Sequence, residues 1–553
     1  MKKLFLLLAL VPMFMMAQER RIVVIADPHV LAPELMDTAS LSFKEMIQTQ
    51  RKMIQWSAEA FDAVLDTCKR YNTTPGMGLD IEAVLIVGDL TKDGEKESHD
   101  YVLEKIKELL MYGIQVYVIP GNHDIGGKAY RYVGDEKEEV ETIDRDGWNN
   151  YYLAEVMKPS SHDRIQYADF NTSTFAVEPF EGLTILGIDG SDDDASIGRL
   201  DDNDRGFIIN VAEKAREKGN TIIAMSHWQV LEHFDQQGTL SASCRFEDAD
   251  EIRDFLMEQG VHLLLTGHFH VNGITTYKDS TGVIPDSLVE ITTGSPITYP
   301  LPFRILTISE DRARVKVETR YLKEPISGHN DVQAYSREWM KEHVDNLIPS
   351  LTLRGFAKAE EIMDTYGVQY LVQAGLTEDA ATAMINLLKG CIPATDEAKI
   401  DLVRRNVGEA LKDLYILHSD ANEPQNPNAQ AIADALYTGM ENMMVEMIST
   451  STALYWAYKM GQLGFIVSAP EAMAREIVQS LIEDKTNRSS ALWSDVTDDL
   501  RGVLMINEPF TGGQAIDDVE ADNTIRSRKQ IRDGQLFIER GEKTFTVTGA
   551  ETK

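Results

Sequence analysis

The chain has 553 residues, of which 54 are lysine or arginine and 89 are aspartate or glutamate, so its formal net charge is −35. Hydrophobic residues make up 43% and charged residues 26%, which excludes a disordered acidic chain and supplies material for more than one packed core. Nucleic-acid-binding proteins normally present a basic surface, so the negative charge argues against a nucleic-acid partner. The three cysteines are too few for a disulfide scaffold.

The first 17 residues have the pattern of a secretory signal peptide. Lys2 and Lys3 precede the apolar run 4–16, and the small residue Ala17 precedes a polar stretch. The apolar run is too short to span a bilayer, and no later run is long enough to predict a membrane span. We therefore expect cleavage near Ala17 and an exported protein, periplasmic or extracellular. The alternative for residues 1–17 is a buried terminal strand or helix.

Residues 21–325 alternate short apolar runs with amphipathic segments, which is the pattern of an α/β domain. Runs rich in β-branched residues predict buried strands at 21–26, 83–87, 116–119, 183–188, 221–225 and 261–265. Helical patterns lie between several of these strands, at about 43–69, 99–110 and 204–217. Three further segments are predicted to be antiparallel strands that complete a second sheet, at 287–293, 303–309 and 313–321.

Residues 330–500 change to helical character. Thr377 and Thr395 are each followed by acidic residues, which predicts that helices begin there. This helical region carries no recognisable motif. It could be a cap that limits access of substrates, a surface for self-association, or a structural support for the α/β domain. Residues 515–553 return to strand character and predict a terminal β-hairpin that turns at 540–543.

Polar residues gather where the predicted strands end. They include five of the 12 histidines, and in chain order they are Asp27, His29, Asp89, Asn122, His123, His227, His268 and His270. Ligands of open α/β sheets bind beyond the carboxyl ends of the strands, so we expect these side chains to meet. Imidazole, carboxylate and amide groups suit Zn, Fe or Mn, and no cysteine lies in these turns.

The number of candidate ligands indicates two metal ions. Alternate residues of an extended chain point to the same side, so Asp27 with His29 and His268 with His270 would each present two ligands together. These pairs and the other strand-end residues exceed the needs of one ion. They suit two ions held about 3.5–4 Å apart, as in two-metal hydrolytic sites.

Two other groups of residues carry weaker predictions. His99 lies in a polar stretch and is predicted to be solvated, and His233 is predicted to lie at a surface or rim. The acidic run 192–194, with Asp201 and Asp204, could bind calcium or form a solvated loop. It lacks the spacing of an EF-hand, which favours the solvated loop.

These residues, in this order, resemble the calcineurin-like metallophosphoesterase family. Its pattern is DxH, GD, GNH followed by D or E, a single H, and GHxH. Over residues 21–325 the chain has every element: DPH at 27–29, GD at 88–89, GNHD at 121–124, SH at 226–227 and GHFH at 267–270. The resemblance implies an enzyme that hydrolyses phosphoesters. It also implies a four-layer α/β/β/α sandwich with two mixed sheets.

The resemblance implies a role for each motif residue. Two divalent or trivalent transition-metal ions (Mn, Fe or Zn) would share Asp89 as a bridging ligand. The remaining ligands would be Asp27, His29 and His270 on the first ion and Asn122, His227 and His268 on the second. His123 would face the scissile phosphate. Asp124 would accept a hydrogen bond from His123 and fix its orientation.

A mechanism and a substrate class follow as expectations. A hydroxide that bridges the two metals would attack phosphorus, and His123 would assist the leaving group. The segment 88–98 resembles the branch of the family that contains class III cyclic-nucleotide phosphodiesterases. An exported acidic chain suits a small phosphodiester or monoester as substrate, and no oligomeric state is predicted. The alternatives are a non-catalytic binding protein on the same scaffold, a nuclease-type phosphodiesterase and a sphingomyelinase-like phosphodiesterase.

Overall fold

The structure is a computed structural model, and it divides the chain into two compact units, residues 1–507 and 508–553. It describes residues 19–74, 79–157, 165–169, 171–191, 197–234, 237–240, 242–278, 287–421, 426–460, 493–498, 501–505, 527–532, 535–540, 543–546 and 551–552. The predicted signal segment and the acidic run 192–194 lie outside these residues. None of the described helices has the length and apolar character that crossing a membrane requires.

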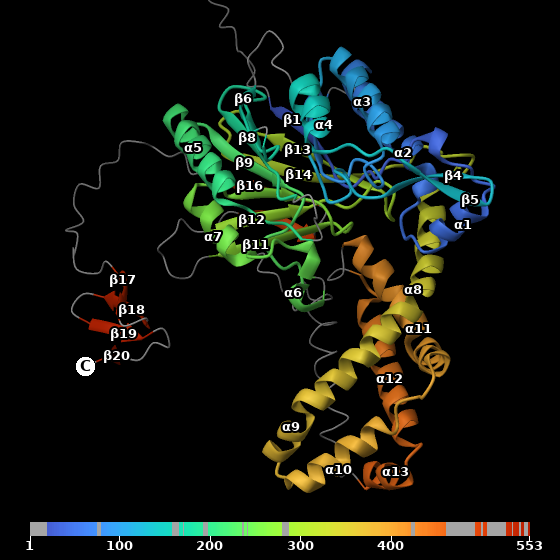
Figure 1. Ribbon diagram of the computed structural model, residues 1–553. Helices are drawn as coiled ribbons and strands as arrows, with labels where there is room; N and C mark the ends of the chain where they lie inside the picture. Colours follow the sequence, from blue (N-terminus) through green and yellow to red (C-terminus); the bar gives the residue numbers. More distant parts are fainter. Residues whose placement is uncertain are drawn as a thin grey trace, which may run out of the picture. The chain divides into compact units, whose positions relative to one another are not determined.

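Two seven-stranded mixed sheets form the centre of the first unit (Figure 1). The first sheet, in the order β15-β16-β14-β13-β1-β2-β3, contains β1 (Arg20–Ile25), β2 (Ile81–Val87), β3 (Gln115–Ile119), β13 (Pro302–Ile308), β14 (Arg314–Tyr321), β15 (Trp493–Asp498) and β16 (Arg501–Met505). The second, in the order β11-β12-β10-β9-β8-β7-β6, contains β6 (Ile165–Ala168), β7 (Phe175–Val177), β8 (Leu183–Ile188), β9 (Thr221–Ser226), β10 (Leu263–Thr266), β11 (Gly273–Lys278) and β12 (Ser287–Thr292). Each strand predicted from a β-branched run is present.

The strand pairing corrects one detail of the predicted topology. The segment 287–293 forms β12 of the second sheet, antiparallel to β11 as predicted and parallel to β10 on its other side. The segments 303–309 and 313–321 are antiparallel as predicted, but β13 pairs with β1 and β14 with β13, so both belong to the first sheet. An apolar run shows that a strand is buried on both faces; its neighbour in the sheet is decided by the crossover connections, which the run does not encode.

Alternate residues of the second sheet pack into different layers. Ile223 and Met225 of β9 belong to the larger core, which also contains side chains of the first sheet. Ala224, between them, belongs to a second core with side chains of α5 (Asp202–Lys218) and α7 (Ala249–Glu258). The larger core includes side chains of α2 (Ser57–Thr73) and α3 (Lys96–Met111). Helices therefore cover the sheets, which confirms the predicted four-layer sandwich.

The helix predicted over 43–69 is divided in the structure. Helix α1 (Leu41–Gln48) ends before α2 begins, and residues 49–56 between them include a 3-10 turn at Ile54–Trp56. The break is fixed by tertiary contact, because the Met53 amide donates a 2.8 Å hydrogen bond to the Ile297 carbonyl. Other short elements of the sandwich include β4 (Ala129–Val133), β5 (Glu136–Val140), α4 (Arg145–Trp148), a π-helix at Asn149–Val156 and α6 (Gln237–Leu240).

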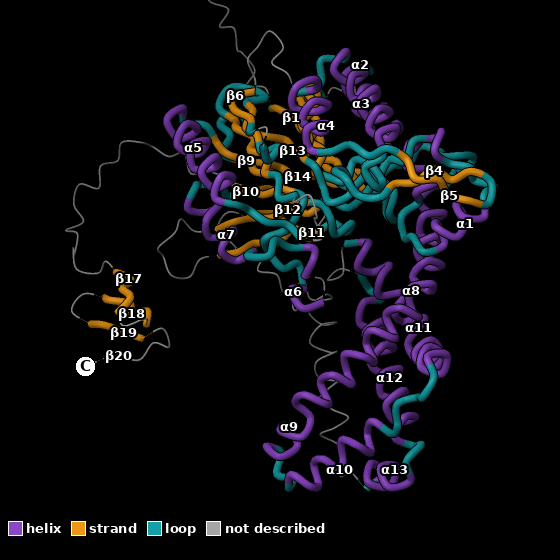
Figure 2. Tube along the Cα trace, in the orientation of Figure 1, coloured by secondary structure: helices purple, strands orange, loops and turns teal. Residues whose placement is uncertain are grey.

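Between residues 332 and 459 the described part of the chain contains helices and no strand (Figure 2). The helices are α8 (Val332–Ile362), α9 (Val368–Gln373), α10 (Glu378–Lys389), α11 (Asp396–Asp420), α12 (Ala429–Ile448) and α13 (Thr452–Lys459). The Thr377 and Thr395 side chains accept hydrogen bonds from the Ala380 and Ala398 amides, so both predicted caps are confirmed. Strand β15 falls inside the predicted helical span and pairs with β16.

The second unit contains four strands in the order β17-β18-β19-β20. Strands β18 (Gln535–Arg540) and β19 (Lys543–Thr546) form the predicted antiparallel hairpin, with Arg540 opposite Lys543. Strand β17 (Ser527–Arg532) lies beside β18, and the short strand β20 (Glu551–Thr552) lies beside β19.

Candidate metal centre

The turns after five strands bring the predicted site residues together. Asp27 and His29 follow β1, Asp89 follows β2, and Asn122 and His123 follow β3. In the second sheet, His227 follows β9, and His268 and His270 follow β10. All five strands run with their carboxyl ends toward this edge, so residues up to 243 positions apart in the chain meet there, consistent with the rule for α/β sheets.

One ligand set contains Asp27, His29, Asp89 and His270, whose candidate ligand atoms lie within 4.8 Å of one another. The Nε2 atoms of His29 and His270 are 3.1 Å apart. His29 Nε2 lies 3.4 Å from Asp89 Oδ2, and His270 Nε2 lies 3.3 Å from Asp27 Oδ1. Two carboxylates and two imidazoles thus converge on one point.

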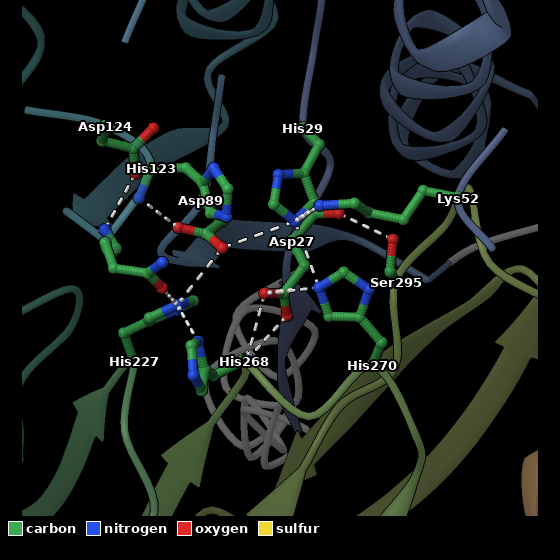
Figure 3. Close-up of polar contacts among 12 residues, drawn as sticks. Asp27, His29, Lys52, Asp89, His123, Asp124, His227, His268, His270 and Ser295 are labelled. Atoms are coloured by element: carbon green, nitrogen blue, oxygen red, sulfur yellow. Dashed lines mark hydrogen bonds and ion pairs between the residues drawn. The ribbon is translucent and has the colours of Figure 1, made fainter. Parts of the chain in front are cut away.

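A second set contains Asp89, His227 and His268, again within 4.8 Å. His227 Nε2 lies 3.4 Å from Asp89 Oδ2, 3.0 Å from His268 Nδ1 and 3.2 Å from Asn122 Oδ1. The other ring nitrogen of His227 donates to the Val87 carbonyl at 3.0 Å, which leaves Nε2 facing the set. Asp89 belongs to both sets and lies between them (Figure 3).

The backbone of these turns is left-handed, which corrects the predicted extended geometry of the DPH and GHFH motifs. Asp27, His29, Asp89, His268 and His270 have φ of 54°, 42°, 51°, 66° and 60°. Non-glycine residues rarely adopt this region, and it costs of order 1–3 kcal/mol each. The pairs therefore converge through strained turns, held by contacts such as the Ser295 hydroxyl, which donates to the Asp27 carbonyl at 2.7 Å.

Two glycines make room for the ligands. A Cβ on Gly121 would lie 2.2 Å from Asp89 Oδ1, and a Cβ on Gly88 would lie 2.3 Å from His227 Nδ1. Gly88 also has φ of 79°, which an L side chain rarely adopts. The glycines of the GD and GNHD motifs thus let neighbouring backbone approach the ligands closely.

Burial keeps most of the site histidines neutral. It lowers the pKa of His268 to about 3, with a further contribution from His227. Burial likewise lowers the pKa of His29 and of His270. Burial opposes ionisation of Asp89, but His227, His123 and His29 outweigh it and hold its pKa well below the usual value. Neutral imidazoles and an ionised carboxylate have lone pairs available for a cation.

His227 behaves differently from the other ligands. Burial opposes its charged form, but Asp89, and then Asp27, raise its pKa to about 9. Without a metal, this proton would supply positive charge between the carboxylates. Closely spaced imidazoles that are mostly neutral turn lone pairs toward one another. Together with the neighbouring carboxylates, they form a donor set that suits transition-metal ions. The residues present therefore fit the two metals that the resemblance implies.

The partner of His123 differs from the predicted one. His123 Nδ1 lies 3.0 Å from Asp93 Oδ1, so the predicted hydrogen bond to Asp124 is wrong. The Asp124 carboxylate instead accepts from the backbone amides of Leu90, Thr91 and Gly121 at 2.8–3.1 Å. It ties the GD turn to the GNHD turn. The family resemblance implied Asp124, whereas its side chain points back into the protein and burial raises its pKa to about 7.

Asp93 is not part of the family motifs, but it lies close to one of them in the sequence. It follows Asp89 by four residues, in the turn that leads into α3. Burial opposes its charge, but the hydrogen bond from His123, followed by the charge of Lys92, lowers its pKa. A carboxylate that accepts from Nδ1 orients the ring.

Two further histidines are more buried than predicted. His99 is fully buried; one ring nitrogen lies 2.8 Å from the Tyr152 hydroxyl and the other 2.9 Å from the Asp124 carbonyl. His233 is also buried, with Nε2 2.9 Å from the Glu290 carboxylate. Asp201 and Asp204, considered for calcium, form the capping box of α5. All four therefore have structural partners in the described part of the chain.

Lys52 is a second site residue that no motif indicated. Its Nζ lies 3.3 Å from His29 Nε2, and it enters from the segment between α1 and α2 (Figure 3). Its position depends on the break between those helices, which the sequence pattern did not predict. The helical region approaches the same side of the sandwich, since the Tyr299 hydroxyl donates to Asp420 of α11 at 2.6 Å.

Fold and site together define a metal-dependent phosphoester hydrolase. A sequence model of the family described as calcineurin-like phosphoesterase matches residues 20–272, which include all five motif turns. Residues 20–272 are thus a calcineurin-like phosphoesterase domain, and the prediction of the family and of the enzyme class is confirmed.

Comparison with other proteins adds structural likenesses. No curated protein matches the sequence. Among solved structures, a dimetal phosphatase from Danio rerio is 14% identical, with a TM-score of 0.37, over 55% of this chain and 96% of its own. Purple acid phosphatase PPD1 from yellow lupin is 12% identical, with a TM-score of 0.35, over 56% of this chain and 52% of its own. The protein TT1561 of Thermus thermophilus is 12% identical, with a TM-score of 0.29, over 55% of this chain and 100% of its own.

Proposed function

We propose that the chain is a dimetal-dependent hydrolase of small phosphoesters, monoesters or diesters, that acts outside the cytoplasm. The observation that carries the proposal is the pair of ligand sets that share Asp89. The completeness of the sets supports an enzyme over a non-catalytic binding protein on the same scaffold. The apolar run at 4–16 and the acidic composition support export and a small substrate rather than DNA.

His123 is suited to assist the leaving group. Its side chain is 33% exposed, whereas those of His29 and His227 are fully buried, so His123 is open to substrate at the edge of the site. Nδ1 faces the Asp93 carboxylate, which leaves Nε2 for the phosphoester. The contact with Asp93 orients the ring, so that His123 can donate a proton from Nε2 to the departing oxygen as the ester bond breaks.

The remaining residues would hold the metals. Asp27, His29 and His270 form one set, Asn122, His227 and His268 form the other, and Asp89 joins them. When bound, two ions of Mn, Fe or Zn would lower the pKa of a coordinated water and neutralise charge on the phosphoryl oxygens. Asp124 holds the two turns that carry Asp89 and His123 in register.

The proposal is tested by metal analysis together with a substrate panel. The purified protein is expected to hold about two metal ions per chain. It should hydrolyse p-nitrophenyl phosphate, bis-p-nitrophenyl phosphate or cyclic AMP, lose this activity on chelation and regain it with Mn, Fe or Zn. Two bound metals without hydrolysis of any of the three esters would favour the binding-protein alternative. Export is tested separately, by sequencing the N-terminus of the mature protein after expression of the full chain.

A further inference from the structure

A lysine from outside the family motifs points into the metal centre. Lys52 Nζ lies 3.3 Å from His29 Nε2, although residue 52 belongs to the segment between α1 and α2 (Figure 3). Its side chain is half-buried. Within the described residues, no carboxylate forms an ion pair with Lys52. By contrast, the nearby Lys92 ammonium is paired with Asp93.

A cation in this position needs an anion beside it. The Lys52 ammonium contacts a histidine that would bind a metal, so a loaded site would repel it. Burying an unpaired ammonium is unfavourable unless an opposite charge compensates. An anionic oxygen beside Lys52 would compensate this charge. In the proposed reaction, a phosphoryl oxygen of the substrate would supply it.

The charge of the site indicates which class of phosphoester fits. Two divalent ions bring about +4, and the carboxylates of Asp27 and Asp89 offset about half of it. The remaining charge, about +2, attracts phosphate anions of either class. The positive charge of Lys52 adds to it and favours the second negative charge that a phosphomonoester, unlike a phosphodiester, carries near neutral pH.

We propose that Lys52 is a substrate-binding residue that makes the site prefer phosphomonoesters over phosphodiesters. The inference rests on the proposed function, since it names the substrate class of the same site. Lysine acts as a compact point charge for phosphate, and a charge-assisted hydrogen bond of this kind changes affinity by about 10- to 100-fold.

The helical region holds the segment that carries Lys52. On one side of it, the Asn346 amide of α8 donates to the Gln48 carbonyl at 2.9 Å. The neighbouring Arg51 guanidinium lies 5.6 Å from the centre of the Tyr415 ring of α11. On the other side, Met53 is buried and bonded to Ile297. Lys52 is therefore fixed by contacts from two helices of the helical region and from the sandwich.

The first experiment compares Lys52→Gln, Lys52→Arg and wild type, each loaded with metal. Lys52→Gln is expected to lower kcat/KM for p-nitrophenyl phosphate by about 10- to 100-fold and to change that for bis-p-nitrophenyl phosphate by less than about threefold. Lys52→Arg, which keeps the charge, should retain most of the monoester activity. Lys44→Gln removes an exposed lysine of α1 and should leave both activities unchanged.

Calorimetry supplies a readout that does not depend on turnover. Lys52→Gln should weaken binding of inorganic phosphate to the metal-loaded protein by a similar factor and leave binding of dimethyl phosphate nearly unchanged, with about two metals still bound per chain. The proposal would be overturned if Lys52→Gln weakened binding of both anions equally, weakened binding of neither, or lost its metal.

A wild-type preference for the diester would overturn the proposal while leaving the proposed function intact. Failure of wild type to hydrolyse either ester would count against the proposed function.

A second variant tests the positioning by α11. Tyr415→Ala removes the ring beside Arg51 and should raise KM for p-nitrophenyl phosphate by about 2- to 5-fold, with kcat for bis-p-nitrophenyl phosphate unchanged. Tyr455→Ala, on α13, is the matched control and should change neither value. Equal effects on both esters would contradict a positioning role for Tyr415.

Discussion

The strand-end turns of the sandwich and the helices between 332 and 459 are built by different rules. The turns contain five non-glycine residues in left-handed conformation, and their ligand side chains are mostly buried. Helices α8, α10, α11 and α13 begin at ordinary side-chain caps, and several large apolar side chains of this region are exposed, such as Tyr366 (62%) and Trp456 (59%). Strain and buried charge concentrate where chemistry is done, because only a rigid scaffold can maintain them.

The two regions nevertheless meet close to the metal centre. Met340 and Val344 of α8 pack with Ile416 of α11 in a small core that Tyr299 also contacts. Thr298, next to Tyr299, has its hydroxyl 3.4 Å from Nδ1 of His270. A segment without a catalytic motif can therefore influence the site through a few residues, and the same substitution should have unequal effects in the two regions.

The largest difference between the two regions is expected when an aspartate carboxylate is removed. Asp89→Ala removes the shared ligand and should reduce hydrolysis of p-nitrophenyl phosphoesters by at least about 1,000-fold, with metal content well below two per chain. Asp364→Ala is the matched control in the helical region, where Asp364 forms an exposed ion pair with Lys389, and should leave activity unchanged. Full activity in Asp89→Ala would remove the basis of the site assignment.

A smaller loss is expected for the His123 and Asp93 pair. His123→Ala should lower kcat by about 100- to 10,000-fold with the metals retained, because a general acid is lost. Asp93→Asn should cost less and shift the pH profile, since the ring keeps its place but loses its charged partner. Phenyl phosphate, with a poorer leaving group, should suffer more than p-nitrophenyl phosphate in both variants. Equal losses for the two substrates would argue against proton donation by His123.

Metal removal should make stability depend on pH through His227. Its folded pKa of about 9 lies above the ordinary value of 6.5, so the metal-free folded state binds the proton more tightly than the unfolded state. This stabilisation is fully present below about pH 6.5 and is lost as pH rises to about 9, with an upper limit of about 3 kcal/mol. Thermal unfolding of chelated protein should show the decline, and His227→Gln should flatten it. A flat curve for chelated wild type would contradict the assigned pairing with Asp89.

The smallest effect is expected for a cap in the helical region. Thr395 accepts a hydrogen bond from the Ala398 amide at 3.2 Å, and Thr395→Ala should lower stability by about 1 kcal/mol. Because Thr395 begins α11 and Tyr415 lies near its end, activity toward both p-nitrophenyl esters should stay at the wild-type level. A substantial loss of monoester activity would show that the whole helix, and not its end alone, supports the site.

The sequence by itself determined the fold class, the buried strands, the caps at Thr377 and Thr395, and which side chains gather at the candidate metal centre. These follow from local periodicity, residue chemistry and motif order, all of which are written in short segments. The eight strand-end residues predicted to meet do lie together in the structure. The predicted extended geometry of the motif pairs is wrong, because these pairs converge through left-handed turns.

Only the tertiary structure decided which side chains support that centre. Asp93, and not the adjacent Asp124, faces His123 because the turn before α3 folds back on the GNHD turn. Lys52 reaches His29 because a contact with Ile297 accompanies a break in a helical pattern that looked continuous. These positions depend on contacts between segments far apart in the chain. Such contacts leave little trace in local sequence, since any residue of suitable size and charge can make them.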